Sequence, residues 1–179
     1  MRMGKRTGRN RAIRALFFAV IFFIFIIHTY FHLAWNSTPS MPLGFYYRRS
    51  PEVIHRGDIV AVCLPSGITQ EGLNQHYLVQ GSCQHASMPV AKQIVAILGD
   101  TVKLTQQAII VNGVSYPAPH QFVDHNGKPV KQFIRFGTYH STGYWLYGSH
   151  DYVHSWDSRY YGRVSRENII GVYRPLVTF

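Results

Sequence analysis

The stretch AKQIVAILGDTVKL, from Ala91 to Leu104, decides the fold class of this chain. Valine and isoleucine are frequent in it, and the Gly99-Asp100 pair near its middle is a typical turn signal. The pattern predicts two consecutive strands joined by a tight turn. Because similar segments lie on both sides of this stretch, we expect a mainly β fold.

Residues 108–116, with the sequence AIIVNGVSY, give the strongest of these neighbouring signals. They place Asn112-Gly113 between two apolar segments, which is typical of a β-hairpin. Three more strand-like segments are GDIVAVCL (57–64), GYWLYGS (143–149) and NIIGVYRPLV (168–177). We expect a short helix over residues 69–80 and an exposed loop over 117–132. A length of 179 residues is natural for one domain.

A long apolar segment, ALFFAVIFFIFIIHTYFHLAW, precedes this domain at residues 15–35. Its first 13 residues, to Ile27, carry no polar side chain. About 20 residues are needed to cross ~30 Å of hydrocarbon, so the segment is long enough to span a bilayer. We therefore expect residues 15–35 to form one transmembrane helix, with Tyr30 and Trp35 near the far interface.

The charge distribution orients this predicted anchor. The formal net charge is +10, and six of the 18 basic residues lie in residues 1–14, which contain no acidic residue. The remaining 12 basic and 8 acidic residues leave only +4. A basic flank stays in the cytoplasm, so residues 1–14 are expected there and residues 36–179 beyond the membrane.

Two other interpretations of the N-terminal segment are less favoured. A cleaved signal peptide also has a basic start and an apolar middle, but AWNSTPS (34–40) offers no good small-x-small cleavage site. A basic arm could bind nucleic acid, yet beside an apolar span it is more simply an orientation signal. We therefore expect an uncleaved anchor and no nucleic-acid partner.

The two cysteines, Cys63 and Cys83, agree with export to an oxidising compartment such as a periplasm. A bridge between them would close a loop of about 20 residues and stabilise the fold by roughly 3 kcal/mol. Two separate buried thiols are the alternative, and a metal site is less favoured still.

Ser40 is the candidate nucleophile, within NSTPSMPLGFYY (residues 36–47). Pro39 and Pro42 fix two backbone torsions around it, and it lies where the chain leaves the predicted anchor. Serine is a weak nucleophile until a base takes its proton. The ten histidines offer no convincing base, because G-x-S-x-G does not occur. His150 and His154 lack an H-E-x-x-H context, so surface positions are expected for them.

Lys92 is the better candidate base, because an otherwise apolar strand would carry its amine into a poorly hydrated place. At an ordinary pKa near ~10.4, only about 0.04% of lysine is neutral at pH 7. Burial disfavours the charged form, and a fall to about 7.4 would cost roughly 4 kcal/mol. By residue type alone, however, a lysine at the start of a strand is usually exposed.

Four segments together resemble a known family. STPSMPLGFY (37–46), RGDIVAVCLP (56–65), AKQIVAILGDTV (91–102) and SWDSRYYGRV (155–164) are similar to the ordered boxes of the signal peptidase I superfamily, most closely the TraF-type peptidases of conjugative DNA transfer. The resemblance extends from Ala15 to Val172. It implies a signal-peptidase-like, β-rich catalytic domain with one membrane span and no metal or organic cofactor.

The resemblance also implies residue roles. Ser40 matches the nucleophile, Lys92 the general base, and Thr38 the position whose hydroxyl helps the Ser40 amide to stabilise the oxyanion. Ser155 matches a position that orients the lysine. Asp157 and Arg159 match a supporting ion pair, which we expect on one face of a strand.

A membrane-anchored serine endopeptidase is therefore the expected function. The resemblance implies single-pass insertion in a bacterial inner membrane, a periplasmic catalytic domain, and a protein substrate such as a pilin precursor or another exported protein. Mating-pair or type IV secretion components are possible partners. Some TraF-like peptidases join the ends of a pilin, so cyclisation is an alternative to hydrolysis. The alternatives to a precursor peptidase are a non-catalytic tethered assembly factor and a self-cleaving regulator.

Overall fold

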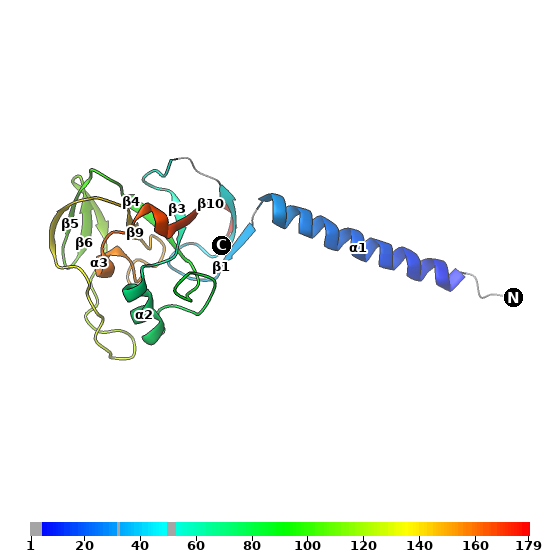
Figure 1. Ribbon diagram of the computed structural model, residues 1–179, viewed down its shortest axis with the longest axis horizontal. Helices are drawn as coiled ribbons and strands as arrows, with labels where there is room; N and C mark the ends of the chain where they lie inside the picture. Colours follow the sequence, from blue (N-terminus) through cyan, green and yellow to red (C-terminus); the bar gives the residue numbers. More distant parts are fainter. Residues whose placement is uncertain (1–4, 32, 50–52) are drawn as a thin grey trace.

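The computed structural model describes residues 5–31, 33–49 and 53–179. It consists of a long N-terminal helix, α1 (Lys5–Phe31), that projects away from a β-rich domain (Figure 1). The domain contains two antiparallel sheets, one of six and one of four strands. The predicted mainly β fold is confirmed.

The larger sheet has the strand order β1-β2-β10-β3-β4-β9. Its strands are β1 (Leu33–Asn36), β2 (Gly44–Arg49), β3 (Ile59–Val62), β4 (Val90–Ala96), β9 (Trp145–Tyr147) and β10 (Ile169–Thr178). The first strand follows α1 closely in the sequence, and the last strand returns between β2 and β3. Segments that lie far apart in the sequence thus become neighbours at the centre of this sheet.

The smaller sheet has the order β7-β6-β5-β8 and confirms both predicted turns. Its strands are β5 (Thr101–Leu104), β6 (Ala108–Val111), β7 (Val114–Pro117) and β8 (Gly137–His140). Asn112 and Gly113 have φ values of 49° and 86°, as a two-residue hairpin with a primed turn requires. Gly99 has φ 88°, and the Asp100 carboxylate closes its turn by accepting from Ile97 N at 2.8 Å.

Short helices fill the connections: α2 (Ser66–Asn74), α3 (Ser158–Tyr161) and the 3-10 turn η1 (Arg166–Asn168). The helix predicted over residues 69–80 begins and ends earlier than expected. After Asn74 the chain turns away, and His76 has φ 60°, a left-handed conformation that a helix cannot continue through. Residues 75–89, which lead into β4, instead form irregular backbone.

Two hydrophobic clusters hold the domain together. The first contains Val60, Val62, Ile94 and Leu146 from the six-stranded sheet, packed with the tyrosines of α3. The second joins β4 and β9 to the four-stranded sheet and centres on Trp145. Because β4 contributes to both clusters, its backbone is fixed from two sides.

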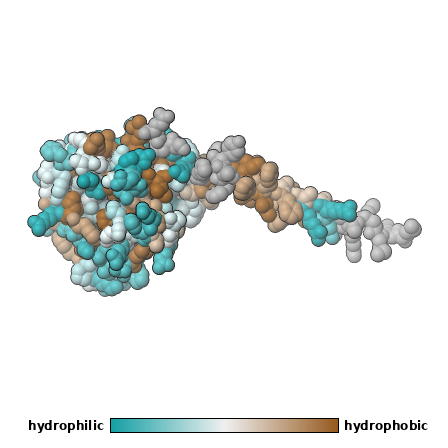
Figure 2. Space-filling model, in the orientation of Figure 1, coloured by the Kyte–Doolittle hydropathy of each residue, from teal (hydrophilic) through white to brown (hydrophobic). Residues whose placement is uncertain are grey.

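Helix α1 differs from the rest in having no such core around it. Its apolar side chains are largely exposed, as Leu16 (67%), Phe18 (67%) and Phe23 (64%) illustrate, and they form the brown stretch in Figure 2. Within the residues that the structure describes, no helix combines the length and the apolar character needed to cross a membrane. The predicted transmembrane helix is therefore not confirmed.

Candidate active site

Ser40 lies in a tight turn between β1 and β2, partly exposed at the surface of the domain. Its carbonyl oxygen accepts a hydrogen bond from His150 N at 3.1 Å, and the Pro39 carbonyl accepts from Asp151 N at 3.0 Å. The turn is thus attached to the loop after β9. This attachment fixes the backbone of Ser40 relative to a segment more than 100 residues later in the sequence.

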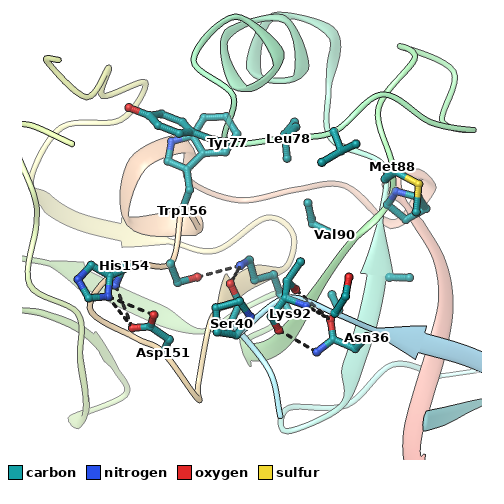
Figure 3. A pocket seen from close by; sticks show the side chains of 18 of the residues that line it. Asn36, Ser40, Tyr77, Leu78, Met88, Val90, Lys92, Asp151, His154 and Trp156 are labelled. Carbon is teal, nitrogen blue, oxygen red and sulfur yellow. Dashed lines mark hydrogen bonds and ion pairs between the residues drawn. The ribbon is translucent and has the colours of Figure 1, made fainter. Parts of the chain in front are cut away.

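Lys92 extends from β4 to meet this turn. Its Nζ lies 2.6 Å from Ser40 Oγ and 2.8 Å from Ser155 Oγ, while only 5% of the residue is exposed. Both partners are hydroxyl groups, so no carboxylate neutralises the amine directly. An amine that donates one N–H to Ser155 can direct its lone pair at Ser40 when it is neutral. The structure thus brings Lys92, Ser40 and Ser155 together, and Figure 3 shows Ser40 beside Lys92.

Burial lowers the pKa of Lys92 from 10.5 to about 8. The Asp157 carboxylate opposes this shift by attracting the ammonium charge, and the Arg159 guanidinium supports it by repelling that charge. Desolvation is the largest of these influences. A useful fraction of Lys92 is therefore neutral at moderately alkaline pH.

Asp157 and Arg159 form a fully buried ion pair, as expected, but not on a strand. Arg159 Nε and Nη2 each lie 2.9 Å from an Asp157 carboxylate oxygen, and both residues are 0% exposed. Asp157 is the N-cap of α3, where its carboxylate also accepts from Arg159 N at 3.1 Å. The strand prediction was wrong because this capping bond begins a helical turn after Asp157.

The ion pair also supports the loop that approaches Ser40. Asp157 Oδ2 accepts from Gly148 N at 3.0 Å, and Arg159 Nη1 donates to the Pro119 carbonyl at 3.0 Å. A Cβ at Gly148 would lie only 2.0 Å from Ser155 Oγ and 3.3 Å from Ser40 Cβ. Position 148 therefore has no room for a side chain, because Ser155 and Ser40 close around it.

Thr38 lies two residues before Ser40, on the exposed side of the turn. Its hydroxyl donates to Asn36 Oδ1 at 2.9 Å. The hydroxyl is therefore close to the nucleophile in the chain but has its hydrogen bond inside the turn. To donate to an oxyanion it would have to rotate away from Asn36.

A cleft of about 960 Å³ runs past Ser40 and Lys92. Its walls are mostly apolar and include Val79. Figure 3 shows Met88 and Val90 on one side of it, with Tyr77 and Trp156 opposite Ser40. The edge of β4 at residues 90–92 opens onto this cleft, since β9 pairs with β4 at Gln93, Ile94 and Ala96. An extended chain laid along that edge would pass the Ser40 hydroxyl.

His154 and Asp151 also line the cleft, where His154 Nδ1 lies 3.0 Å from Asp151 Oδ1. The His154 side chain is 76% exposed, as predicted for a surface histidine. Across residues 5–31, 33–49 and 53–179, no three potential ligand side chains gather in a group that could hold a metal ion.

The disulfide predicted from the cysteine pair is present. Cys63, just after β3, is bonded to Cys83, with an S–S distance of 2.04 Å and a Cα–Cα distance of 5.5 Å. Cys83 belongs to the irregular segment that continues into the cleft wall at Met88. The bridge therefore ties one wall of the cleft to the central sheet.

This arrangement defines a class of enzyme: a serine peptidase of the signal peptidase I type. The family model of signal peptidase, peptidase S26, matches residues 8–177, and the chain belongs to this family. The chain is also similar to the plasmid transfer protein TraF of Escherichia coli, with 30% identity over 146 residues, 80% of this chain and 82% of the relative.

Two further matches were found. The conjugal transfer protein TraF of Agrobacterium fabrum (strain C58) is 28% identical over 146 residues, 80% of this chain and 81% of that protein. A solved structure of signal peptidase I from Enterococcus faecalis V583 has 23% identity and a TM-score of 0.39, covering 69% of this chain and 98% of that chain.

Two residues of the site were not anticipated. Asn36 lies at the centre of the nucleophile turn and hydrogen-bonds to several of its backbone groups. Gly148 provides the space in which the serines meet Lys92. The asparagine before S-T-P-S was a signal for a side-chain-supported turn, because asparagine often bonds nearby backbone. No local pattern marked Gly148.

Proposed function

We propose that this peptidase uses Ser40 as its nucleophile and Lys92 as its general base. One observation carries the proposal: a buried amine, with its pKa lowered to about 8, lies 2.6 Å from a serine hydroxyl at the side of a cleft. General bases work best when their pKa lies near the operating pH. Ser155 supports this role, because its hydroxyl holds the amine in one orientation.

The reaction follows from this geometry. Lys92 accepts the Ser40 proton as Oγ attacks the scissile carbonyl carbon, and the resulting ammonium gives a proton to the leaving amine as the peptide C–N bond breaks. The Ser40 backbone amide and the Thr38 hydroxyl are the donors proposed for the oxyanion. Ser40 is then esterified to the N-terminal part of the substrate until water or an amine attacks the ester.

The substrate proposed is an exported precursor that binds in an extended conformation. The open edge of β4 at residues 90–92 supports this, because peptides often bind by adding a strand to such an edge. The relatives named plasmid or conjugal transfer proteins support a role in conjugation. A conjugative pilin precursor, presented among mating-pair or type IV secretion components, is the substrate class that we propose.

The location proposed is a bacterial inner membrane, with residues 15–31 of α1 as the anchor, residues 1–14 in the cytoplasm and the domain from β1 onward in the periplasm. Residues 33–35, which were expected in the anchor, belong to β1 and pair with β2. The exposed apolar side chains of α1 and the six basic residues before them support it. The Cys63–Cys83 bridge supports an oxidising compartment.

The test is coexpression of the chain with a candidate pilin precursor, followed by the intact mass of the pilin. Ser40→Ala and Lys92→Ala should each abolish processing while leaving a membrane-bound, disulfide-bonded protein. Lys92→Arg should also be inactive, because guanidinium does not lose its proton. Processing by the Ser40→Ala protein would instead favour a non-catalytic assembly factor.

The same masses distinguish the two fates of the acyl-enzyme. A tethered amine can compete with water because well-aligned intramolecular groups reach effective molarities of 10⁵ M or more. A circular pilin would be one water lighter than the linear chain between the same cleavage sites. A free N-terminus at the full linear mass would exclude cyclisation for that substrate.

A further inference from the structure

The nucleophile turn is built around one side chain, Asn36, the last residue of β1. The residue is only 9% exposed, and its carboxamide points into the turn formed by the following six residues. Asn36 Nδ2 lies within hydrogen-bond distance of three carbonyl oxygens: Thr38 at 2.9 Å, Met41 at 3.0 Å and Pro42 at 3.0 Å. These carbonyls stand on both sides of Ser40, so their common donor limits how far the turn can open.

The other half of the carboxamide binds Thr38. Asn36 Oδ1 accepts from the Thr38 backbone N at 3.2 Å and from Thr38 Oγ1 at 2.9 Å. Asn36 thus makes two kinds of contact, one to the carbonyls around Ser40 and one to the hydroxyl proposed for the oxyanion. Figure 3 shows Asn36 beside Lys92 and Ser40, at the base of the cleft.

The chemistry of the contacts requires an amide. The three carbonyls need a donor, whereas the Thr38 N–H and hydroxyl need an acceptor, and only a carboxamide of this length presents both. An aspartate would keep the acceptor but turn a carboxylate oxygen toward the three carbonyl oxygens. An alanine would leave both sets of backbone groups without their partner.

We propose that Asn36 is a positioning residue for the nucleophile. Its Nδ2 fixes the turn so that Ser40 Oγ stays within reach of Lys92, and its Oδ1 holds the Thr38 hydroxyl ready. When negative charge develops on the substrate oxygen, the Thr38 hydroxyl turns toward it, while the Thr38 N–H remains bound to Asn36. The inference deepens the proposed Ser40–Lys92 mechanism and rests on it.

The test compares Asn36→Asp with Asn168→Asp in the full-length chain, using purified protein in detergent and a pilin precursor peptide. Asn168 is the matched control, because its carboxamide also supports a turn, by accepting from Ser165 N and donating to the Cys63 carbonyl. Asn36→Asp should lower kcat by about 10²-fold, since a displacement of about 1 Å can cost that much, and change KM by less than about threefold. Asn168→Asp should keep its kcat.

A double substitution tests the link to Thr38. Thr38→Val and Asn36→Ala together should slow cleavage by less than the product of their separate effects, because alanine removes the acceptor that holds the Thr38 hydroxyl and valine removes that hydroxyl itself. If the two effects on the rate multiply, Asn36 does not act through the Thr38 hydroxyl, and that part of the proposal is wrong. An Asn36→Asp protein with an intact disulfide and the kcat of Asn168→Asp would overturn the positioning role.

Two further variants separate a loss of positioning from a loss of folding and from a failure of the Ser40–Lys92 dyad. Asn36→Ser, whose single short hydroxyl cannot replace both halves of the carboxamide, is used if the aspartate variant does not fold, and it should show a similar loss of kcat. If neither folds while Asn168→Asp does, Asn36 is a structural residue and the inference is wrong. Ser40→Ala is measured beside them: its activity would refute the dyad itself, whereas its inactivity leaves the dyad standing whatever Asn36 does.

Discussion

Raising the pH should activate this enzyme over a range in which ordinary lysines stay fully protonated. The proposed base is the neutral form of Lys92, and its pKa is lowered to about 8 by burial on β4. Activity that depends on the unprotonated form increases as pH rises through the pKa. Cleavage should therefore rise with pH and level off above about pH 9.

The size of the rise follows from the pKa. With a pKa of about 8, roughly 1% of Lys92 is neutral at pH 6, about 9% at pH 7 and about 91% at pH 9. Consequently kcat/KM should increase about tenfold between pH 7 and pH 9. An unshifted lysine with a pKa near 10.5 would give about a hundredfold rise over the same range and no plateau by pH 9.

The measurement is kcat/KM for a precursor peptide from pH 6 to pH 10, because this ratio reports the pKa of the free enzyme. Arg56→Gln serves as a control, since Arg56 is partly exposed, pairs with the buried Asp100 at 2.6 Å, and does not line the cleft. It should reproduce the wild-type profile. A flat profile in both proteins, with chemistry shown to be rate-limiting, would refute Lys92 as the base.

Four other outcomes are expected. Thr38→Val should slow cleavage by roughly 10²-fold if its hydroxyl supports the oxyanion, and an unchanged single-turnover rate would remove Thr38 from the site. Lys92→Met should be more stable than the wild type at pH 7. Burial lowers the pKa of Lys92 in the folded state, so the wild type gains stability only as pH rises from about 8 towards 10.5. In urea titrations, the difference in unfolding free energy between the two proteins should shrink by about 2 kcal/mol between pH 7 and pH 9.5. Gly148→Ala should abolish cleavage, since its Cβ would meet Ser155 Oγ at 2.0 Å, and full activity of a folded variant would contradict that packing. Replacing Cys63 and Cys83 by serine should cost roughly 3 kcal/mol of stability, measured as the shift in unfolding midpoint, and an unshifted midpoint would show that the bridge adds nothing.

Much of the fold could be predicted from local patterns. The β-branched segments became strands, and Asn112-Gly113 became a hairpin turn, because both depend on backbone preferences of adjacent residues. The meeting of Ser40 with Lys92 was predicted by resemblance and not by local pattern. It depends on the three-dimensional course of the chain, because Ser40 and Lys92 are 52 residues apart in the sequence and β2, β10 and β3 lie between β1 and β4 in the sheet.

The predictions that were wrong or absent concern residues whose partners lie elsewhere. Asp157 was expected on a strand, but its buried carboxylate caps α3 and holds Gly148. His76, in a left-handed conformation, ends the predicted helix early for a reason that its residue type does not indicate. Gly148 carries no conformational signal, because what forbids a side chain there is the side chain of Ser155.

The short chain segment between α1 and Ser40 limits the distance between the proposed membrane anchor and the nucleophile. Helix α1 ends at Phe31, nine residues before Ser40, and nine residues span at most about 30 Å when fully extended. The distance from Phe31 to Ser40 is shorter than this, because the chain reverses direction at the Ser40 turn, between the antiparallel strands β1 and β2. With α1 embedded as proposed, the nucleophile cannot reach peptide bonds far above the bilayer. Under this proposal, a long exported protein is protected along most of its length, and only bonds that lie close to the lipid surface are cut.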